Sequence, residues 1–161
     1  MSGPAGATAI LGYNGGQLAS CVSFRSGETA SSRLRGFTLS AGFGSPHPTQ
    51  SFWVGGGLYI ENASPRIQDC VISGNDAQLG AGVFALGGAP AFTNCVIESQ
   101  GNIAGVYLGG GLRCESSSPT LVGTTIQGNQ ASTGGGASFW ACNSTLTACT
   151  VRGNGGYDSG G

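Results

Sequence analysis

A repeat with a period of about 25 residues is the feature that most constrains the fold of this chain. Three landmarks recur at common intervals. The first is a glycine, beginning with Gly57; the second is a position usually occupied by proline, beginning with Pro65; the third is a cysteine or threonine, beginning with Cys70. The glycine recurs at positions 57, 82, 111 and 136, and the other two landmarks advance by the same steps, so all three share one four-residue insertion. A fixed period of this length indicates a solenoid or array whose units pack on their neighbours.

The composition of each unit selects among the repeat architectures. Glycine supplies 32 of the 161 residues, and glycines stand where a leucine-rich or helical repeat would need a helix. Each unit instead contains short apolar strands separated by Gly, Asn, Ser and Pro. Successive coils would stack equivalent strands about 4.7–4.9 Å apart in parallel sheets. The sequence therefore predicts an all-β parallel β-helix, a solenoid of about six coils of roughly 25 residues.

Alternation along each strand assigns its side chains to two faces. Leu58 and Ile60 point together, as do Cys70 and Ile72, and their equivalents in the other units should form inward columns. The last strand of each unit gives one such column: Ile72, Ile97, Ile126 and Val151. Asparagines recur at one corner, where stacked amides can bond backbone groups and each other: Asn75, Asn129 and Asn154.

These units resemble the right-handed parallel β-helix repeats of bacterial surface proteins. The resemblance rests on Gly55-Gly56-Gly57-Leu58-Tyr59, Ser64-Pro65 and the run from Asp69 to Asn75. Gly135-Gly136-Ala137 and Ile72-Ser73-Gly74-Asn75 are the nearest counterparts of the marks of polymorphic outer-membrane protein repeats. The wider superfamily includes pectin lyases and polygalacturonases. The resemblance covers roughly residues 33–154 and implies a right-handed coil, which the chirality of parallel crossovers also favours.

We expect the whole chain, residues 1–161, to form one β-helix domain. Protruding loops are predicted near residues 99–108, where the four-residue insertion falls, and near 43–54, which is rich in Ser, Pro and Gly. No polar, amphipathic helix caps either end, and Gly160-Gly161 falls where a further coil would open. A bare terminal coil exposes core and strand edges. The sequence thus suggests a segment of a longer solenoid, or end-to-end self-association through open solenoid ends.

Charge and hydropathy exclude several classes of partner. Lysine is absent, and six arginines stand against seven acids, for a net charge of −1. This balance offers no basic surplus for nucleic-acid binding. A membrane-spanning helix needs an apolar run of about 20 residues. The chain contains no apolar run approaching that length, so this segment should not insert into a membrane. Cys-x-x-Cys pairs are absent, and neither a metal site nor any other cofactor is predicted.

The cysteines are interpreted chiefly as core residues. Cys70, Cys95 and Cys149 share one column with Thr124, so the position calls for a small inward side chain. Disulfides remain as an alternative. They could form between neighbouring coils, for example from Cys70 to Cys95, and Cys142 could close a small loop with Cys149.

Acid–base residues form no recognisable catalytic arrangement, and no catalytic residue is predicted. His47, the only histidine, lies in Ser45-Pro46-His47-Pro48, a loop signal that predicts a solvent-exposed ring. Glu61 and Glu115 share a repeat position two coils apart, which separates their backbones by roughly 9–10 Å. That spacing is at the upper edge for inverting glycosidases. The clustered aspartates of polygalacturonase-like enzymes and the acidic calcium ligands of pectate-lyase-like enzymes are not evident.

One outward row forms a candidate glycan-binding face because it combines aromatic and charged side chains. Sugar rings stack on aromatic side chains while polar groups bind their hydroxyls. The row contains Tyr59, Glu61, Phe84, Arg113, Glu115 and Trp140. The competing interpretation is that these side chains merely cover the sheet or contact an inserted loop.

Together these observations predict a non-catalytic structural or adhesive β-helix module of an extracellular or cell-surface protein. Two alternatives stay open. One is a carbohydrate-binding module that uses the outward aromatic face, with a polysaccharide as its partner. The other is an enzyme similar to polysaccharide lyases or glycoside hydrolases.

Overall fold

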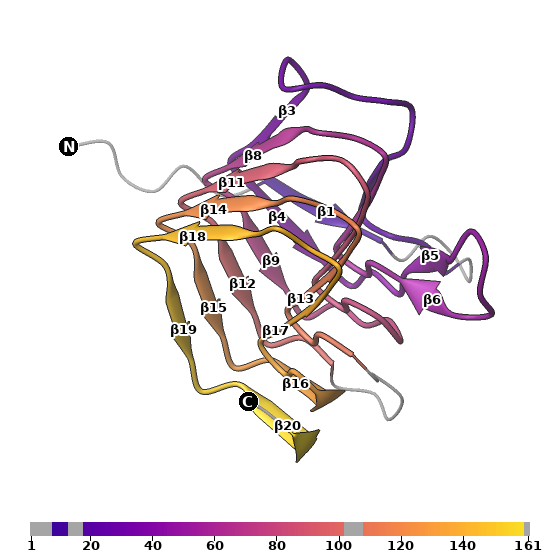
Figure 1. Cartoon of the computed structure of the whole chain (residues 1–161), viewed down its shortest axis with the longest axis vertical. Coiled ribbons are helices and arrows are strands. Elements are labelled where there is room, and N and C mark those ends of the chain that lie inside the picture. The colour runs from indigo at the N-terminus through magenta and orange to yellow at the C-terminus, as the bar shows by residue number, and fades with distance from the viewer. Residues whose placement is uncertain (1–7, 13–17, 102–107, 160–161) are drawn as a thin grey trace.

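The computed structural model describes residues 8–12, 18–101 and 108–159, which form a parallel solenoid (Figure 1). Each turn passes through three sheets. Sheet I contains β2 (Val22–Phe24), β7 (Leu58–Glu61), β10 (Val83–Leu86), β13 (Leu112–Glu115) and β17 (Ala137–Trp140). Sheet II contains β3 (Arg33–Arg35), β8 (Arg66–Gln68), β11 (Ala91–Thr93), β14 (Thr120–Val122) and β18 (Thr145–Thr147). Sheet III contains β1 (Thr8–Leu11), β4 (Phe37–Ser40), β9 (Val71–Ser73), β12 (Val96–Glu98), β15 (Thr125–Gln127) and β19 (Thr150–Arg152).

The strand order gives five complete turns, and β1 adds one strand of an earlier turn. The described residues contain strands, turns and bends but no helix, which confirms the all-β prediction. None of these elements could therefore be a membrane-spanning helix. A further parallel pair, β16 (Gln130–Thr133) with β20 (Gly155–Ser159), extends the last turns.

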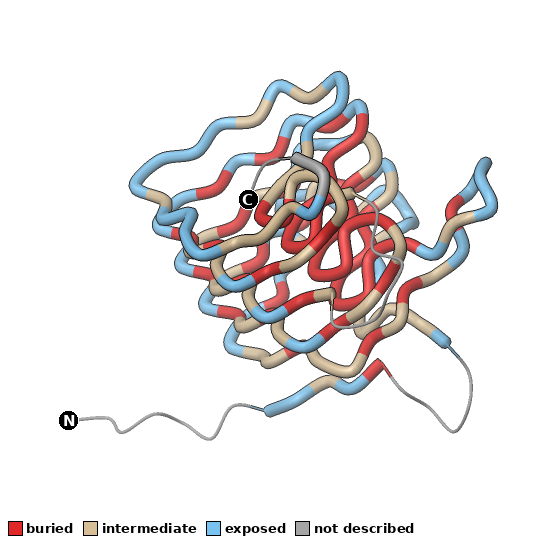
Figure 2. The backbone as a smooth tube through the Cα atoms, turned by 90° about the horizontal axis from the view of Figure 1, so that it is seen from below, coloured by how far each residue is buried: buried red, intermediate tan, exposed pale blue. Residues whose placement is uncertain are grey.

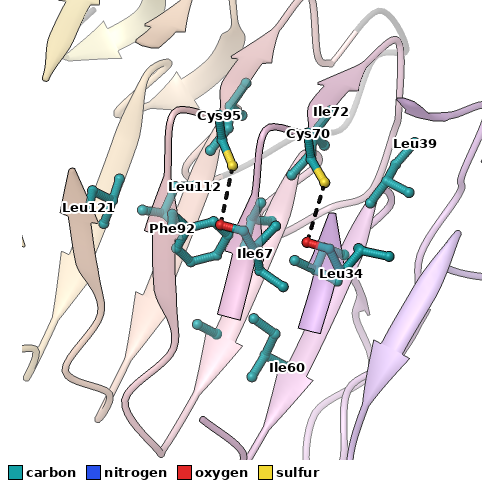
Figure 3. Packing of buried hydrophobic residues seen from close by; sticks show 14 of the residues in the cluster. Leu34, Leu39, Ile60, Ile67, Cys70, Ile72, Phe92, Cys95, Leu112 and Leu121 are labelled. Atoms are coloured by element: carbon teal, nitrogen blue, oxygen red, sulfur yellow. Dashed lines mark hydrogen bonds between the residues drawn. The ribbon is translucent and has the colours of Figure 1, made fainter. Parts of the chain in front are cut away.

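The inward columns predicted from alternation are confirmed. Ile72 pairs in register with Ile97, which pairs with Ile126, which pairs with Val151. Buried positions recur along the successive turns (Figure 2). The main apolar cluster lies inside the solenoid, where side chains from successive turns pack on each other (Figure 3). Burial falls in the last described turn, where three inward positions are 42, 42 and 51% exposed: Phe139, Leu146 and Val151.

The corners after sheets II and III each place one residue per turn in the left-handed backbone region. After sheet II the positions with positive φ are Gly36, Asp69, Asn94, Gly123 and Ala148. After sheet III they are Ala41, Gly74, Ser99, Gly128 and Gly153. Glycine adopts this conformation without a steric penalty, and Asn and Asp tolerate it better than most residues. The repeated Gly, Asn and Ser of the sequence thus mark the corners.

The asparagine column is also confirmed, and it contains one residue that the pattern did not reveal. Gln100 occupies the asparagine position of its turn, and its Oε1 accepts a hydrogen bond from the Asn75 amide at 2.8 Å. Asn129 accepts from the Gln100 amide at 3.2 Å and donates to Ile97 O at 3.0 Å. Asn154 continues the column by accepting from the Asn129 amide at 3.0 Å. A continuous polar ladder therefore closes this corner.

The structure describes the predicted loop at 43–54 in full and the predicted loop at 99–108 only in part. Within 43–54, β5 (Ser45–Pro46) and β6 (Trp53–Val54) form an antiparallel hairpin that projects beside the solenoid (Figure 1). Of the loop near 99–108, residues 102–107 lie outside the described residues.

The prediction that cysteines fill the core is confirmed for Cys70 and Cys95. Cys114 forms a disulfide with Cys142, 28 residues away in the neighbouring turn, so a bridge between neighbouring coils is present but neither named pair is. Cys70 and Cys95 are buried free thiols that donate to Leu34 O and Ile67 O of sheet II (Figure 3). Burial raises the pKa of the Cys95 thiol to about 11, as expected for a core residue.

Candidate functional site

Loop residues cover part of the outward face of sheet I, which agrees with the interpretation that its aromatic side chains contact a loop rather than form an open surface. Tyr59 and Phe84 do point away from the solenoid interior, but both are fully buried. They pack with Val54 and Leu79 in a second apolar cluster, which Phe52 of the hairpin loop borders. The hairpin covers this face because its own apolar residues need a partner surface and the aromatic row provides one.

His47 lies within this covered region, so the prediction of a solvent-exposed ring is wrong. Its side chain is 2% exposed, and its ring meets the Phe84 ring edge-on with 5.5 Å between centroids. Nδ1 accepts from the backbone amides of Thr49 at 3.2 Å and Gln50 at 3.1 Å. A nitrogen that accepts carries no proton, so this network assigns the neutral tautomer with its proton on Nε2.

The Nε2 atom of His47 points toward the sheet and has no hydrogen-bond partner among the described residues. The group it faces there is Glu115, whose Oε2 lies 3.9 Å away. That distance exceeds the range of a direct hydrogen bond. His47 therefore supplies a buried donor next to a carboxylate.

Glu61 is held by two donors at one end of the row. The Tyr59 hydroxyl donates to Glu61 Oε2 at 2.9 Å, and Arg25 Nε donates to the same oxygen at 2.8 Å. Burial alone would raise the pKa of Glu61, but the hydrogen bonds from Arg25 and Tyr59 outweigh it and lower the pKa. Burial and the adjacent carboxylate raise the pKa of the Tyr59 hydroxyl. This end is a fixed ion pair between Arg25 and Glu61.

Glu115 forms a second ion pair two strands away. Arg113 and Glu115 alternate onto the same face of β13, and Arg113 Nε donates to Glu115 Oε1 at 2.9 Å. Arg113 also donates to Ser138 Oγ in β17 at 2.7 Å. Glu61 and Glu115 flank Leu86 in register, as the repeat predicted. Each carboxylate thus has its own arginine, and one strand separates them.

A pocket of about 230 Å³ opens between the hairpin loop and this end of sheet I. Trp140, which is 60% exposed, stands at this pocket beside the Arg113–Glu115 pair. The lining residues are Gln50, Phe52, Leu79, Leu108, Arg113, Glu115 and Trp140.

The structure therefore divides the six predicted site residues into two groups. Arg113, Glu115 and Trp140 line the pocket, while Tyr59, Glu61 and Phe84 do not. The sequence analysis missed Gln50 and Phe52, which the hairpin loop contributes. Their signal was the apolar run Phe52-Trp53-Val54 within a segment otherwise rich in Ser and Pro. In the described parts of the chain, no three His, Cys, Asp or Glu side chains are grouped as a metal site would require.

Comparison with known proteins identifies the architecture. Residues 51–160 match the family model described as a right handed beta helix region, and this match covers more than half of the chain. No curated protein gives a significant match. No solved structure does so either.

Proposed function

Since this chain belongs to the right-handed beta helix family, we propose that it serves as a non-catalytic structural module of an extracellular or cell-surface protein. The observation that carries the proposal is the part of the outward face of sheet I that the hairpin covers. The aromatic side chains there pack into a second apolar cluster, and the carboxylates of Glu61 and Glu115 are each bonded to an arginine. These groups stabilise the module's own hairpin and turns.

Two further features support a stiff extracellular scaffold. Backbone hydrogen bonds join each turn to the next, as when Val83 N donates to Gly111 O at 2.9 Å and Leu112 N to Gly136 O at 3.0 Å. Such nearest-neighbour ladders resist bending and local opening. The Cys114–Cys142 disulfide supports an oxidising location, because disulfides persist outside the cytosol and are rare within it.

The test of the non-catalytic assignment is product release from a panel of polysaccharides, from acid to alkaline pH. We expect neither reducing sugar nor unsaturated product from the wild-type chain. Glu115→Gln removes the pocket carboxylate, and Glu98→Gln is the matched control on the outer face of sheet III. Activity that disappears in Glu115→Gln and persists in Glu98→Gln would overturn the assignment.

End-to-end contact between copies is a second part of this proposal. Its support is the exposure of Phe139, Leu146 and Val151, inward positions with no further turn covering them in the described chain. Light scattering should show a mass that climbs with concentration, because head-to-tail contacts do not close. Val151→Lys should reduce this growth. A single monomer mass at every concentration would remove self-association from the proposal.

One specific observation favours carbohydrate binding as a second candidate function. The exposed Trp140 ring stands beside a charge-neutral Arg113–Glu115 pair. A cationic ligand would face Arg113 and an anionic ligand would face Glu115, so a neutral, hydroxyl-rich ring fits best. Its apolar face can stack on the indole while its hydroxyls bond to the pair.

A glycan array separates this candidate from the structural role. If the pocket binds a neutral sugar, Trp140→Ala should lose retention of the bound glycan. Trp53→Ala is the control, because Trp53 is an exposed tryptophan of the hairpin that does not line the pocket. Absence of binding, or equal binding by both variants, would remove the candidate.

A further inference from the structure

Within the described chain, two of the six arginines differ from the others in lacking a side-chain partner. The four with an acceptor at 2.8–2.9 Å are Arg25 with Glu61, Arg35 with Asp69, Arg113 with Glu115, and Arg152 with Gln127. The guanidinium groups of Arg33 and Arg66 make no ion pair or side-chain hydrogen bond with any described residue. Both side chains are exposed.

The fold places these two arginines side by side. Arg33 in β3 pairs in register with Arg66 in β8, and the two strands are neighbours in sheet II (Figure 1). The next residues, Leu34 and Ile67, are buried in the core, so alternation directs both arginines outward. A strand spacing of about 4.7–4.9 Å therefore places the two arginine side chains next to each other on the outer face of sheet II.

The neighbouring residues in sheet II do not neutralise the positive charges of Arg33 and Arg66. Like charges directly opposite each other destabilise a sheet. Asp69, which follows β8, is already bonded to Arg35 and Asn94. On the other side, Arg66 pairs with Ala91, whose short side chain leaves that flank open.

Protection of a sheet edge explains the charge of Arg33 but not that of Arg66. Charged residues on an edge strand discourage pairing with other chains, and β3 is the edge of sheet II as described. This accounts for Arg33 and Arg35. Arg66 lies on the second strand, where no edge needs protection, so its charge next to Arg33 requires another reason.

We propose that Arg33 and Arg66 form a binding site for a sulfate or phosphate group. A guanidinium presents a planar fork of N–H donors that matches such oxyanions, and two adjacent forks can share one anion between them. The bound anion would cancel the repulsion within the pair. This site lies on the outer face of sheet II, whereas the pocket beside Trp140 lies on sheet I.

The first test is thermal unfolding in sodium sulfate against sodium chloride at matched ionic strength. Sulfate stabilises folded proteins in general because it strengthens apolar burial. The result is therefore the difference between the wild type and each variant in the rise of Tm that sulfate causes. We expect sulfate to raise the Tm of the wild type by more than it raises the Tm of Arg33→Gln or Arg66→Gln. Arg152→Gln makes the same charge change on sheet III and should retain it. In chloride, Arg66→Gln should unfold no earlier than the wild type, which verifies its fold. Equal sulfate responses in all four proteins would refute the site.

The second test distinguishes the source of the anion. Retention on dextran sulfate, compared with uncharged dextran, probes sulfate carried by a polymer. We expect binding that weakens about tenfold or more in each of the two variants, the scale of one charge-assisted hydrogen-bonding group. A saturable effect of inorganic sulfate without polymer retention would assign the site to a free ion. Failure of both probes would overturn the proposal, and neither result depends on the structural role proposed above.

Discussion

Replacing Asn129 by alanine should destabilise the solenoid far more than the same change one turn later. Asn129 is fully buried in the corner ladder. Its Oδ1 accepts from the Gln100 amide at 3.2 Å, and its Nδ2 donates to Ile97 O at 3.0 Å and to Asn154 Oδ1 at 2.9 Å. Alanine removes all three hydrogen bonds and leaves the Gln100 amide without its acceptor.

The magnitude follows from the burial of the groups left behind. A buried donor that loses its only partner costs about 1–3 kcal/mol, and each further hydrogen bond contributes about 1 kcal/mol. We therefore expect Asn129→Ala to lower the free energy of unfolding by about 3–5 kcal/mol. For a chain of this size that loss corresponds to a fall in Tm of about 6–20 °C. Water can reach the partly exposed Asn154 and replace its bonds, so Asn154→Ala should cost about 1 kcal/mol.

Urea denaturation of both variants, followed by circular dichroism and by tryptophan fluorescence, measures this difference. Coincident transitions would support two-state behaviour and justify the comparison of free energies. The reasoning rests on buried polar groups that only the ladder can satisfy. A cost for Asn129→Ala that is no larger than that for Asn154→Ala would refute it.

Three other predictions concern different elements of the fold. Ala148 has a φ of 52°, so Ala148→Gly should raise the free energy of unfolding by about 0.5–1 kcal/mol. Ala137→Gly within β17 should lower it, and calorimetry showing the same sign for both would contradict the argument. The lowered pKa of Glu61 means that its stabilisation is present above its ordinary value of 4.5 and is lost as pH falls through the folded value. Urea midpoints measured at decreasing pH should therefore fall less steeply in Glu61→Gln, and parallel profiles would exclude this role. Reduction of Cys114–Cys142, which closes a loop of 28 residues, should cost about 3–4 kcal/mol. Thermal unfolding with and without reductant checks this, since a variant with both cysteines replaced by alanine should not respond.

The repeat could be predicted because the pattern that defines it lies within short stretches of sequence. Inward positions such as Ile72 and Ile97 follow from alternation within each short strand, and stacking then brings equivalents together. Gln100 escaped the pattern because glutamine replaces asparagine there. The repeat interval identifies it, since Gln100 lies one repeat after Asn75 and one repeat, lengthened by the insertion, before Asn129.

The covered face of sheet I was predicted only in part. The sequence correctly directs Tyr59 and Phe84 away from the solenoid interior, and it correctly places Arg113 and Glu115 beside them. It leaves open whether that row faces solvent or contacts a loop, and it does not identify residues 45–54 as the covering segment. His47 illustrates the limit, because flanking prolines indicate a loop but not whether the loop docks on the protein or extends into solvent.

What the sequence determined by itself is the coil: its period, its short strands, its inward columns and its polar corner. These depend on alternation and on residues with positive φ, both of which act over a few neighbouring residues. The tertiary structure alone decided that the hairpin of residues 45–54 covers sheet I, that His47 is buried against Phe84, and that Cys114 pairs with Cys142. Each of those contacts involves a residue that occurs in one turn only, such as His47 in the hairpin or the cysteines at 114 and 142. The period therefore does not encode them, and only the packed chain brings their atoms together.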